Sequence, residues 1–241
     1  MIKLYQFPIS HYCEKARWAL DYKQIPYQTI NLIPGLHLKL TKKLGVRSSV
    51  PILQHNDKVV AGSSQIIDHL ETLKLNNSLS FDDELLNKQV VDWETTLDKT
   101  AGINVRLAAY HVLLEHPEIV KPFFTHQGPW YGPLFVSFAF NKLSKTMRKL
   151  MNINQQTFES GKQSLHLLLD KLSEHYSHSE FLVGDRFSRA DLSAAALFAP
   201  LVMPQGYGLN WPKKVPEDYQ ELLNEFSEKL SWVEPLYQKY R

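Results

Sequence analysis

The sequence is poor in cysteine, and the one thiol in 241 residues cannot form an internal disulfide. Such usage is typical of proteins from reducing compartments. No stretch of about 18 consecutive apolar residues occurs, which argues against a membrane span. Neither sign of charge is in excess, since 27 Lys and Arg stand against 25 Asp and Glu. A nucleic-acid groove would show a basic excess, so we expect a soluble, cytoplasmic protein with no nucleic-acid partner.

Several motifs that carry chemistry are also missing. The ten histidines form no His-Glu-x-x-His motif, and the closest pairs are His111 with His116 and His175 with His178. With a single cysteine beside them, we expect no metal site. Gly-x-Gly-x-x-Gly, Gly-x-x-x-x-Gly-Lys-Ser/Thr and Gly-x-Ser-x-Gly do not occur. Dinucleotide binding, phosphate-loop chemistry and serine hydrolysis are therefore not supported.

What is present is an ordinary globular composition, 44% apolar and 22% charged, at a length that allows one or two domains. The first eighty residues alternate strand-like and helix-like patterns. Asn56 and Asp57 lie between two β-type runs and indicate a hairpin turn. We expect strands at Ile2–Phe7, Tyr27–Leu32, Pro51–Gln54 and Lys58–Ala61, helices at about Tyr12–Tyr22 and from Ser63 or Ser64 to Leu73, and a loosely helical stretch at Pro34–Leu44.

Beyond a short polar linker at residues 76–80, every pattern is helical. Ser188 and Asp191 have the spacing of a capping box, in which each side chain satisfies a backbone N–H. We therefore expect a small α/β domain at residues 1–75 and an all-helical domain at residues 84–241. The expected helices are a long one with Leu86, Val90, Trp93, Leu97 and Ala101 on one face, then 135–150, 158–176, 217–230 and 232–240.

The junction between the first strand and the first helix is the leading candidate for chemistry. Ser10 lies near the first turn of that helix, where unpaired N–H groups and a partial positive charge favour an anion. A hydroxyl at this place can donate to a thiolate and lower the pKa of the thiol. Spacing alone favours a plain helix cap instead. Cys13 shares a helix face with Ala16 and Leu20, which predicts a packing role in the core.

Two other junctions and one loop are candidate ligand contacts. A cis Val50–Pro51 bond would expose the Val50 backbone to an extended ligand, although most X-Pro bonds are trans. Ser63 begins a helix and could hold a carboxylate or only cap the helix. The segment Gly128–Pro133 has the composition of a loop, and its Trp130 could line a pocket or pack in the core.

The order and spacing of these elements resemble the cytosolic glutathione S-transferase family over essentially the whole chain. The most specific matches are the segments Ser10–Arg17, Val50–Leu53 and Phe181–Asp185 leading to Ala190 and Asp191. The resemblance implies a thioredoxin-like N-terminal domain that binds glutathione, followed by an all-α domain that completes an electrophile site. It also implies that Ser10 meets the glutathione sulfur, that the Val50 backbone pairs with the tripeptide's cysteine, that Pro51 is a cis-proline and that Ser63 holds the γ-glutamyl carboxylate.

Two positions depart from the family pattern. Family members have Glu or Asp immediately before that serine, whereas this chain has Gly62. The partner of the γ-glutamyl amine is therefore missing or supplied from elsewhere, and the loss of such a surface pair weakens binding by only about 0–1 kcal/mol. The loop Leu44–Ser49 lacks the usual Asn-Pro and Gly pattern, so no contact can be transferred there.

The function implied is transfer of glutathione, as a co-substrate and without a metal, to a small hydrophobic electrophile, with Ser10 as the donor to the thiolate. The alternatives are a glutathione-dependent thiol–disulfide or peroxide reductase and a non-catalytic binding or scaffold protein. Arg106 and Tyr110 are four residues apart on one helix face, and with Trp130 they are the expected pocket residues. Family membership further implies a homodimer and a role in detoxification.

Overall fold

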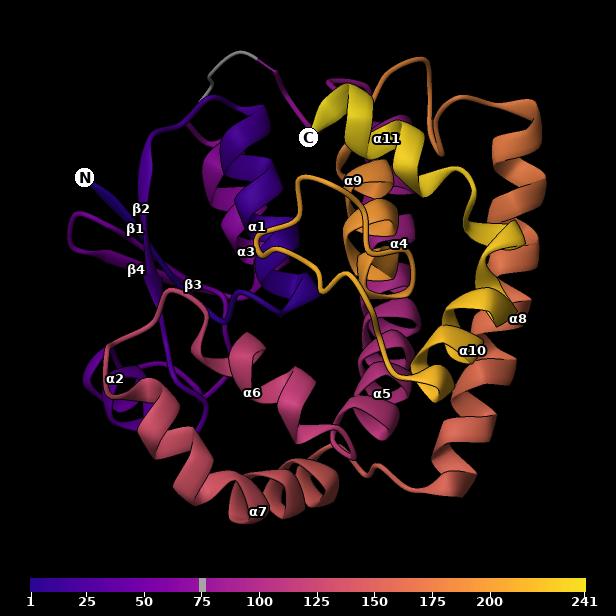
Figure 1. The fold of residues 1–241 in the computed structure, drawn as a ribbon. Helices are drawn as coiled ribbons and strands as arrows, with labels where there is room; N and C mark the ends of the chain where they lie inside the picture. The colour runs from indigo at the N-terminus through magenta and orange to yellow at the C-terminus, as the bar shows by residue number, and fades with distance from the viewer. Residues whose placement is uncertain (74–76) are drawn as a thin grey trace.

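The computed structural model describes residues 1–73 and 77–241. Four strands form one mixed sheet in the order β2-β1-β3-β4 (Figure 1). The central strand β1 pairs in parallel with β2, with Ile2 opposite Tyr27, and antiparallel with β3. The strands are β1 (Ile2–Gln6), β2 (Tyr27–Asn31), β3 (Ile52–His55) and β4 (Lys58–Ala61). The four expected strands are thus confirmed, and β3 and β4 form the expected antiparallel hairpin.

Helices cover both faces of this sheet. Helix α1 (His11–Tyr22) and helix α3 (Ser63–Glu71) lie on the face turned toward the helical half (Figure 1). Helix α2 (His37–Lys43) covers the other face, where Leu40 packs over Ile52 and its neighbours. This arrangement is the α/β, thioredoxin-like layering that the sequence predicted.

The second half is entirely helical. The expected long helix is interrupted at Thr100, whose φ of -105° and ψ of -65° depart from regular helix geometry. A helical hairpin, α6 and α7, then follows; the predicted loop at Gly128–Pro133 lies at its turn, and α7 begins at Gly132, three residues before the predicted start at 135. The helices are α4 (Glu84–Lys99), α5 (Ala101–Leu113), α6 (Pro117–Thr125), α7 (Gly132–Leu150), α8 (Gln155–His178), α9 (Arg189–Phe198), α10 (Glu217–Phe226) and α11 (Val233–Tyr240), with 3-10 turns at Ala199–Leu201 and Glu228–Leu230.

Helix α9 is the centre of the helical half. Both halves of the predicted capping box are present, since the Ser188 Oγ accepts from Ala190 and the Asp191 carboxylate accepts from the Ser188 N–H at 3.0 Å. All ten residues of α9 are buried. Burial on every side favours the apolar run of alanines in this helix, and the two charges at its start are paired, Arg189 with Glu94 and Asp191 with the Ser188 N–H.

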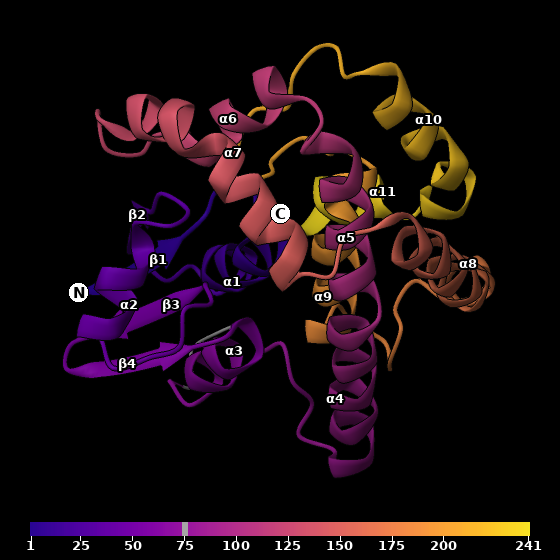
Figure 2. The same ribbon diagram turned by 90° about the horizontal axis from the view of Figure 1, so that it is seen from below.

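The two halves share one apolar core. Trp18 on α1 is fully buried, stacks on Phe187, and donates its indole N–H to the Tyr240 carbonyl at 2.8 Å. Figure 2, seen from below, shows α1 lying between the sheet and the helices α5 and α9. The side of α1 that faces the helical half is therefore fixed by packing, and its N-terminus is held in place.

The predicted linker connects the halves but is also anchored. The Arg186 guanidinium donates to the carbonyls of Ser78 and Ser80 at 2.6 Å each, and Leu79 between them is fully buried. Asn76, the first residue of that linker, and the predicted boundary at residue 75 lie outside the described residues. None of the helices in the described ranges is long and apolar enough to cross a membrane.

Candidate functional site

Ser10 is the N-cap of α1. Its backbone is extended, and its Oγ accepts a hydrogen bond from the Cys13 N–H at 3.4 Å. The Ser10 carbonyl accepts the first helical bond, from Glu14, at 2.9 Å. Because the cap uses only an acceptor lone pair, the Ser10 hydroxyl can still donate its proton. Within the chain it is directed at the Cys13 thiol, whose pKa this hydrogen bond acts to lower, and the sulfur of a ligand would compete for the same proton. The capping role and a donor role are therefore compatible.

Cys13 is fully buried one turn into α1. Burial raises the pKa of the Cys13 thiol above its ordinary value because the thiolate would lose its hydration. The thiol is therefore protonated and inaccessible, which confirms the packing role predicted from its helix face. A low-pKa thiol exposed to a ligand would be needed for redox chemistry at this place.

The two residues after Ser10 attach α1 to the break between α4 and α5. The His11 ring nitrogen Nε2 lies 2.9 Å from the Gly102 carbonyl, and the Tyr12 hydroxyl donates to the Asp98 carbonyl at 2.7 Å. A Cβ at Gly102 would lie 2.2 Å from the Tyr12 hydroxyl, so a glycine is required there. Burial is the main cause that lowers the pKa of His11 to about 3, and the Arg106 charge lowers it further. His11 is therefore neutral at pH 7.

A cavity of about 300 Å³ opens beside Ser10. The sheet half contributes Ser10 and Val50 to its wall, and α5 contributes Arg106 and Tyr110. Figures 1 and 2 show α7 crossing from the side of α2 toward α5. Leu143, Thr146, Met147 and Leu150 of this helix form a further part of the wall. The apolar lining consists mainly of Phe7, Ile9, Leu113, Phe124, Leu143, Met147, Leu150, Met151 and Tyr219. The volume and the apolar lining are those of a small-molecule site.

Arg106 and Tyr110 are brought together in this cavity, one turn apart on α5. Burial raises the pKa of Tyr110 to about 12, against a smaller opposing effect of the Arg106 charge. The buried Arg106 Nε has no hydrogen-bond partner among the described residues. The cavity thus combines an apolar wall with one guanidinium and one phenol.

The Val50–Pro51 peptide bond is cis. Spacing alone favours the trans form, so only the family resemblance indicated this geometry. Val50 lines the cavity, and neither its N–H nor its carbonyl is hydrogen-bonded within the described chain. The Val50 backbone is therefore free to pair with an extended ligand.

Ser63 is buried at the first turn of α3, but it does not cap the helix. Gly62 is the N-cap, and no side chain caps α3, so the predicted serine cap is wrong. The φ of Gly62 is +100°, a conformation that residues with a side chain rarely adopt, and a Cβ there would lie 2.2 Å from the Gln65 Oε1. This backbone geometry gives a physical reason for glycine at position 62.

The carboxylate of Asp98 lies beside the start of α3. It accepts from the Ser64 hydroxyl at 2.6 Å and from the Lys15 ammonium at 2.8 Å. Lys15 also pairs with Glu94 at 2.8 Å, and Arg189 pairs with the other oxygen of Glu94 at 2.6 Å. This network fixes α3 against α1, α4 and α9, so the position of Ser63 is set by buried charges.

Trp130 is not in the cavity. Its side chain is 88% exposed in the turn before α7, and the outward face of that helix also exposes Phe138. Sequence analysis left packing and a pocket role equally open for Trp130, and the structure shows neither. Among the aromatic residues between positions 110 and 140, Tyr110 and Phe124 are the ones that line the cavity.

Sequence reasoning missed the contribution of α7. Leu143, Met147 and Leu150 of that helix face the cavity, and their spacing of four and three residues is a helix-face signal that the sequence contained. The tertiary placement of α7 over Ser10 had no such signal. No group of three or more His, Cys, Asp or Glu side chains able to hold a metal occurs in residues 1–73 and 77–241.

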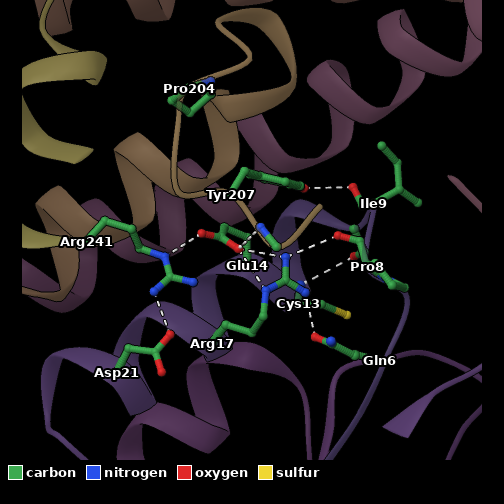
Figure 3. A network of polar contacts seen from close by, with 12 residues as sticks. Gln6, Pro8, Ile9, Cys13, Glu14, Arg17, Asp21, Pro204, Tyr207 and Arg241 are labelled. Carbon is green, nitrogen blue, oxygen red and sulfur yellow. Dashed lines mark hydrogen bonds and ion pairs between the residues drawn. The ribbon is translucent and has the colours of Figure 1, made fainter. Parts of the chain in front are cut away.

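A second buried polar cluster surrounds Glu14 on α1 (Figure 3). The Glu14 carboxylate accepts from Arg17 at 2.8 Å, from Arg241 at 2.7 Å and from the Gly208 N–H at 3.2 Å. Burial alone would raise the pKa of Glu14, but the two guanidinium groups hold it below its usual value. Tyr207 completes the cluster by donating to the Ile9 carbonyl at 2.7 Å, one residue before Ser10. The backbone leading to Ser10 is thus held from both halves.

Comparison with known proteins gives matches over most of the chain. The glutathione S-transferase N-terminal domain model matches residues 4–78, and the C-terminal domain model matches residues 111–233. The chain is 22% identical over 220 residues to glutathione S-transferase TCHQD of Arabidopsis thaliana, covering 83% of this chain and 77% of that protein.

Solved structures show the same fold. The β-etherase LigF of Sphingobium superposes with a TM-score of 0.64 at 19% identity, over 99% of both chains. Maize glutathione S-transferase I, in complex with an atrazine glutathione conjugate, superposes with a TM-score of 0.63 at 16% identity, over 99% of this chain and 92% of that one. With both domain models matched in order along one chain of the predicted fold, the protein belongs to the glutathione S-transferase family.

Proposed function

We propose that the protein binds glutathione beside the N-terminus of α1 and transfers it to a small, mostly apolar electrophile held in the cavity. The single observation that carries this proposal is the state of Ser10. Its oxygen caps α1 as an acceptor, which leaves the O–H group to donate at the edge of an apolar cavity. A donor combined with the positive end of a helix stabilises a thiolate relative to the thiol.

Two further contacts would hold the tripeptide. The unpaired backbone of Val50 would pair with the cysteine residue of glutathione, as a short added strand. Ser63 and the free N–H groups at the start of α3 would hold the γ-glutamyl carboxylate. Gly62 supplies no carboxylate for the amine, so we expect weaker binding than an acidic residue would give.

The reductase alternative is less well supported. Such chemistry requires an accessible thiolate at the site, and the only thiol of the chain, Cys13, is buried and has a raised pKa. The non-catalytic alternative is favoured by Gly62 alone. Proteins named as a β-etherase and as glutathione S-transferases share this fold. The fold alone therefore does not decide the reaction, and activity assays must identify it.

Family membership alone supports three further proposals: a homodimer, a cytoplasmic location and a role in detoxification. A molar mass of about one chain in solution, measured by light scattering, would contradict the homodimer. The location and the role depend on which electrophile is used, and they follow only after the reaction is known.

The test compares Ser10→Ala with Cys13→Ala. For Ser10→Ala we expect the pKa of bound glutathione, read from thiolate absorbance, to rise by about one unit or more, and conjugation of 1-chloro-2,4-dinitrobenzene to fall about 10- to 100-fold. Cys13→Ala should leave both quantities nearly unchanged. Ser10→Thr is the matched control, because it keeps both the cap acceptor and the O–H donor.

Two results would overturn the proposal. The first is the absence of glutathione binding by calorimetry together with the absence of conjugation, which would favour the scaffold alternative. The second is a larger effect for Cys13→Ala than for Ser10→Ala, or a mixed disulfide of glutathione on Cys13 detected by mass spectrometry, which would favour redox chemistry.

A further inference from the structure

Arg106 is the only charged side chain in the wall of the cavity. Of the 24 lining residues, none is Asp, Glu or Lys. The two lining histidines are neutral at pH 7, because burial is the main cause that lowers the pKa of both His11 and His37. The cavity therefore presents a single positive charge against a largely apolar surface.

This charge has no partner among the described residues. Three other arginines at the junction of the two halves each pair with a buried carboxylate: Arg17 with Glu14, Arg189 with Glu94 and Arg241 with Glu14. Within the described ranges, Arg106 makes neither a hydrogen bond nor an ion pair, and its Nε is buried. An unpaired guanidinium beside apolar side chains is costly, and such a charge is usually retained where it meets a ligand.

The charge also reaches the site itself. Arg106 lines the same cavity as His11, Tyr12 and Tyr110. In keeping with this placement, its charge lowers the pKa of His11 and opposes the rise in the pKa of the two tyrosines. Tyr110 lies one turn farther along α5, on the same face, and its hydroxyl donates to no described residue. Because its pKa is about 12, this hydroxyl is a proton donor at pH 7. Guanidinium and phenol together form a pair of donors suited to a carboxylate.

We infer that the second substrate of this protein carries a carboxylate, and that Arg106, assisted by Tyr110, binds that carboxylate while the apolar wall holds the rest of the molecule. The inference rests on the proposed function, since it concerns the electrophile that would meet the glutathione sulfur. It assigns Arg106 to substrate selection. Ser10 keeps the role of donor to the sulfur, so the two residues act on opposite ends of the reacting pair.

The experiment uses two stable product analogues that differ only in the group of interest. S-benzylglutathione and S-(4-carboxybenzyl)glutathione are titrated by calorimetry into the wild type, Arg106→Gln, Arg106→Lys and Arg148→Gln. Arg148 is the matched control, since it is an arginine of α7 whose partner is the exposed Glu115. Thermal melting of each variant checks that it is folded.

For the wild type we expect the carboxybenzyl compound to bind about tenfold or more tightly than the benzyl compound, the size of one charge-assisted pair. Arg106→Gln should abolish that preference and leave the affinity for S-benzylglutathione within about twofold. Arg106→Lys should retain part of the preference, because a lysine keeps the charge but not the two-pronged geometry. Arg148→Gln should bind both compounds as the wild type does.

The outcomes separate the inference from the proposed function. If neither analogue binds the wild type, the glutathione site itself is wrong. If both bind equally well, or if the preference survives in Arg106→Gln, the glutathione site stands and the carboxylate inference is wrong. If Arg106→Gln weakens both analogues equally, Arg106 serves the glutathione moiety, which also overturns the inference.

Discussion

Two arginine environments adjoin α1, one around Glu14 and one in the wall of the cavity, and they differ in whether the guanidinium pairs with a carboxylate among the described residues. In the first, Arg17 and Arg241 share the Glu14 carboxylate (Figure 3). In the second, Arg106 lines the cavity, and its Nε is unpaired among the described residues.

The comparison distinguishes an arginine whose charge stabilises the fold from one whose charge can bind a ligand. A guanidinium that donates to a buried carboxylate stabilises the fold and has few N–H groups left for a ligand. Removing one partner of such a pair leaves the other buried and unpaired. A guanidinium without a partner adds no ion pair to the stability of the fold, and its N–H groups remain free to donate to a ligand. Loss of a partner should therefore destabilise the protein strongly in the Glu14 cluster, whereas removal of Arg106 should not.

The largest expected effect is that of Glu14→Gln. The change leaves the Arg17 guanidinium buried without a carboxylate and removes one of the two carboxylates of Arg241, which keeps Asp21. It should lower the free energy of unfolding by about 3–5 kcal/mol. Chemical denaturation at pH 7 measures this. Asp82→Asn, at an exposed residue, is the control and should stay within about 0.5 kcal/mol of the wild type. If Glu14→Gln lowered the free energy of unfolding by less than about 1 kcal/mol, the proposed difference between the Glu14 cluster and the Arg106 site would be wrong.

The same variant has a pH signature. The pKa of Glu14 is lower in the folded state than its ordinary value of 4.5, so its contribution is complete above that value and declines as the pH falls through the folded pKa. The difference in unfolding free energy between wild type and Glu14→Gln should therefore be constant above about pH 5 and narrow below it. A difference that widens on acidification would show that the carboxyl is not ionised in the native protein.

A smaller effect, on the cavity side, concerns His11. Its pKa falls from 6.5 to about 3 on folding, so the unfolded chain binds the proton more readily, and stability is lost as the pH drops from about 6.5 toward 3. The slope is at most one proton, or about 1.4 kcal/mol per pH unit. His11→Gln should flatten this part of the stability curve, measured by denaturation between pH 7 and 4. A curve of unchanged slope would mean that His11 is charged in the native state.

Removal of the unpaired charge should act in the opposite direction to Glu14→Gln. Arg106→Met replaces a guanidinium by an apolar side chain of similar length in an apolar wall, and such changes are often neutral or stabilising. We expect the free energy of unfolding to rise by about 0–1 kcal/mol, measured in the absence of any ligand. A loss of about 2 kcal/mol or more would reveal a partner within the protein and place Arg106 in the same class as Arg17.

The Glu14 cluster and the cavity also differ in how far the sequence predicted them. Ser10 and Cys13 could be separated from sequence because both assignments depend on local helix geometry, namely a cap position and a helix face. The contacts of Glu14 could not, since its partner Arg241 is 227 residues away and only the assembled helices bring them together. The break at Thr100 and the placement of α7 are likewise tertiary results, and the serine cap of α3 failed because Gly62 takes the cap position with a positive φ.

The smallest effect is expected at Trp130, which sequence analysis grouped with Arg106 and Tyr110. With its ring 88% exposed and outside the cavity lining, Trp130→Ala should change the free energy of unfolding by no more than about 0.5 kcal/mol and leave the affinity for S-benzylglutathione unchanged. Tyr110→Phe is the matched comparison inside the cavity: it keeps the ring and removes only the hydroxyl, so it should weaken S-(4-carboxybenzyl)glutathione selectively. If Trp130→Ala weakened either analogue more than Tyr110→Phe does, the cavity beside Arg106 would extend to the turn before α7, and the unpaired charge would no longer define where the substrate lies.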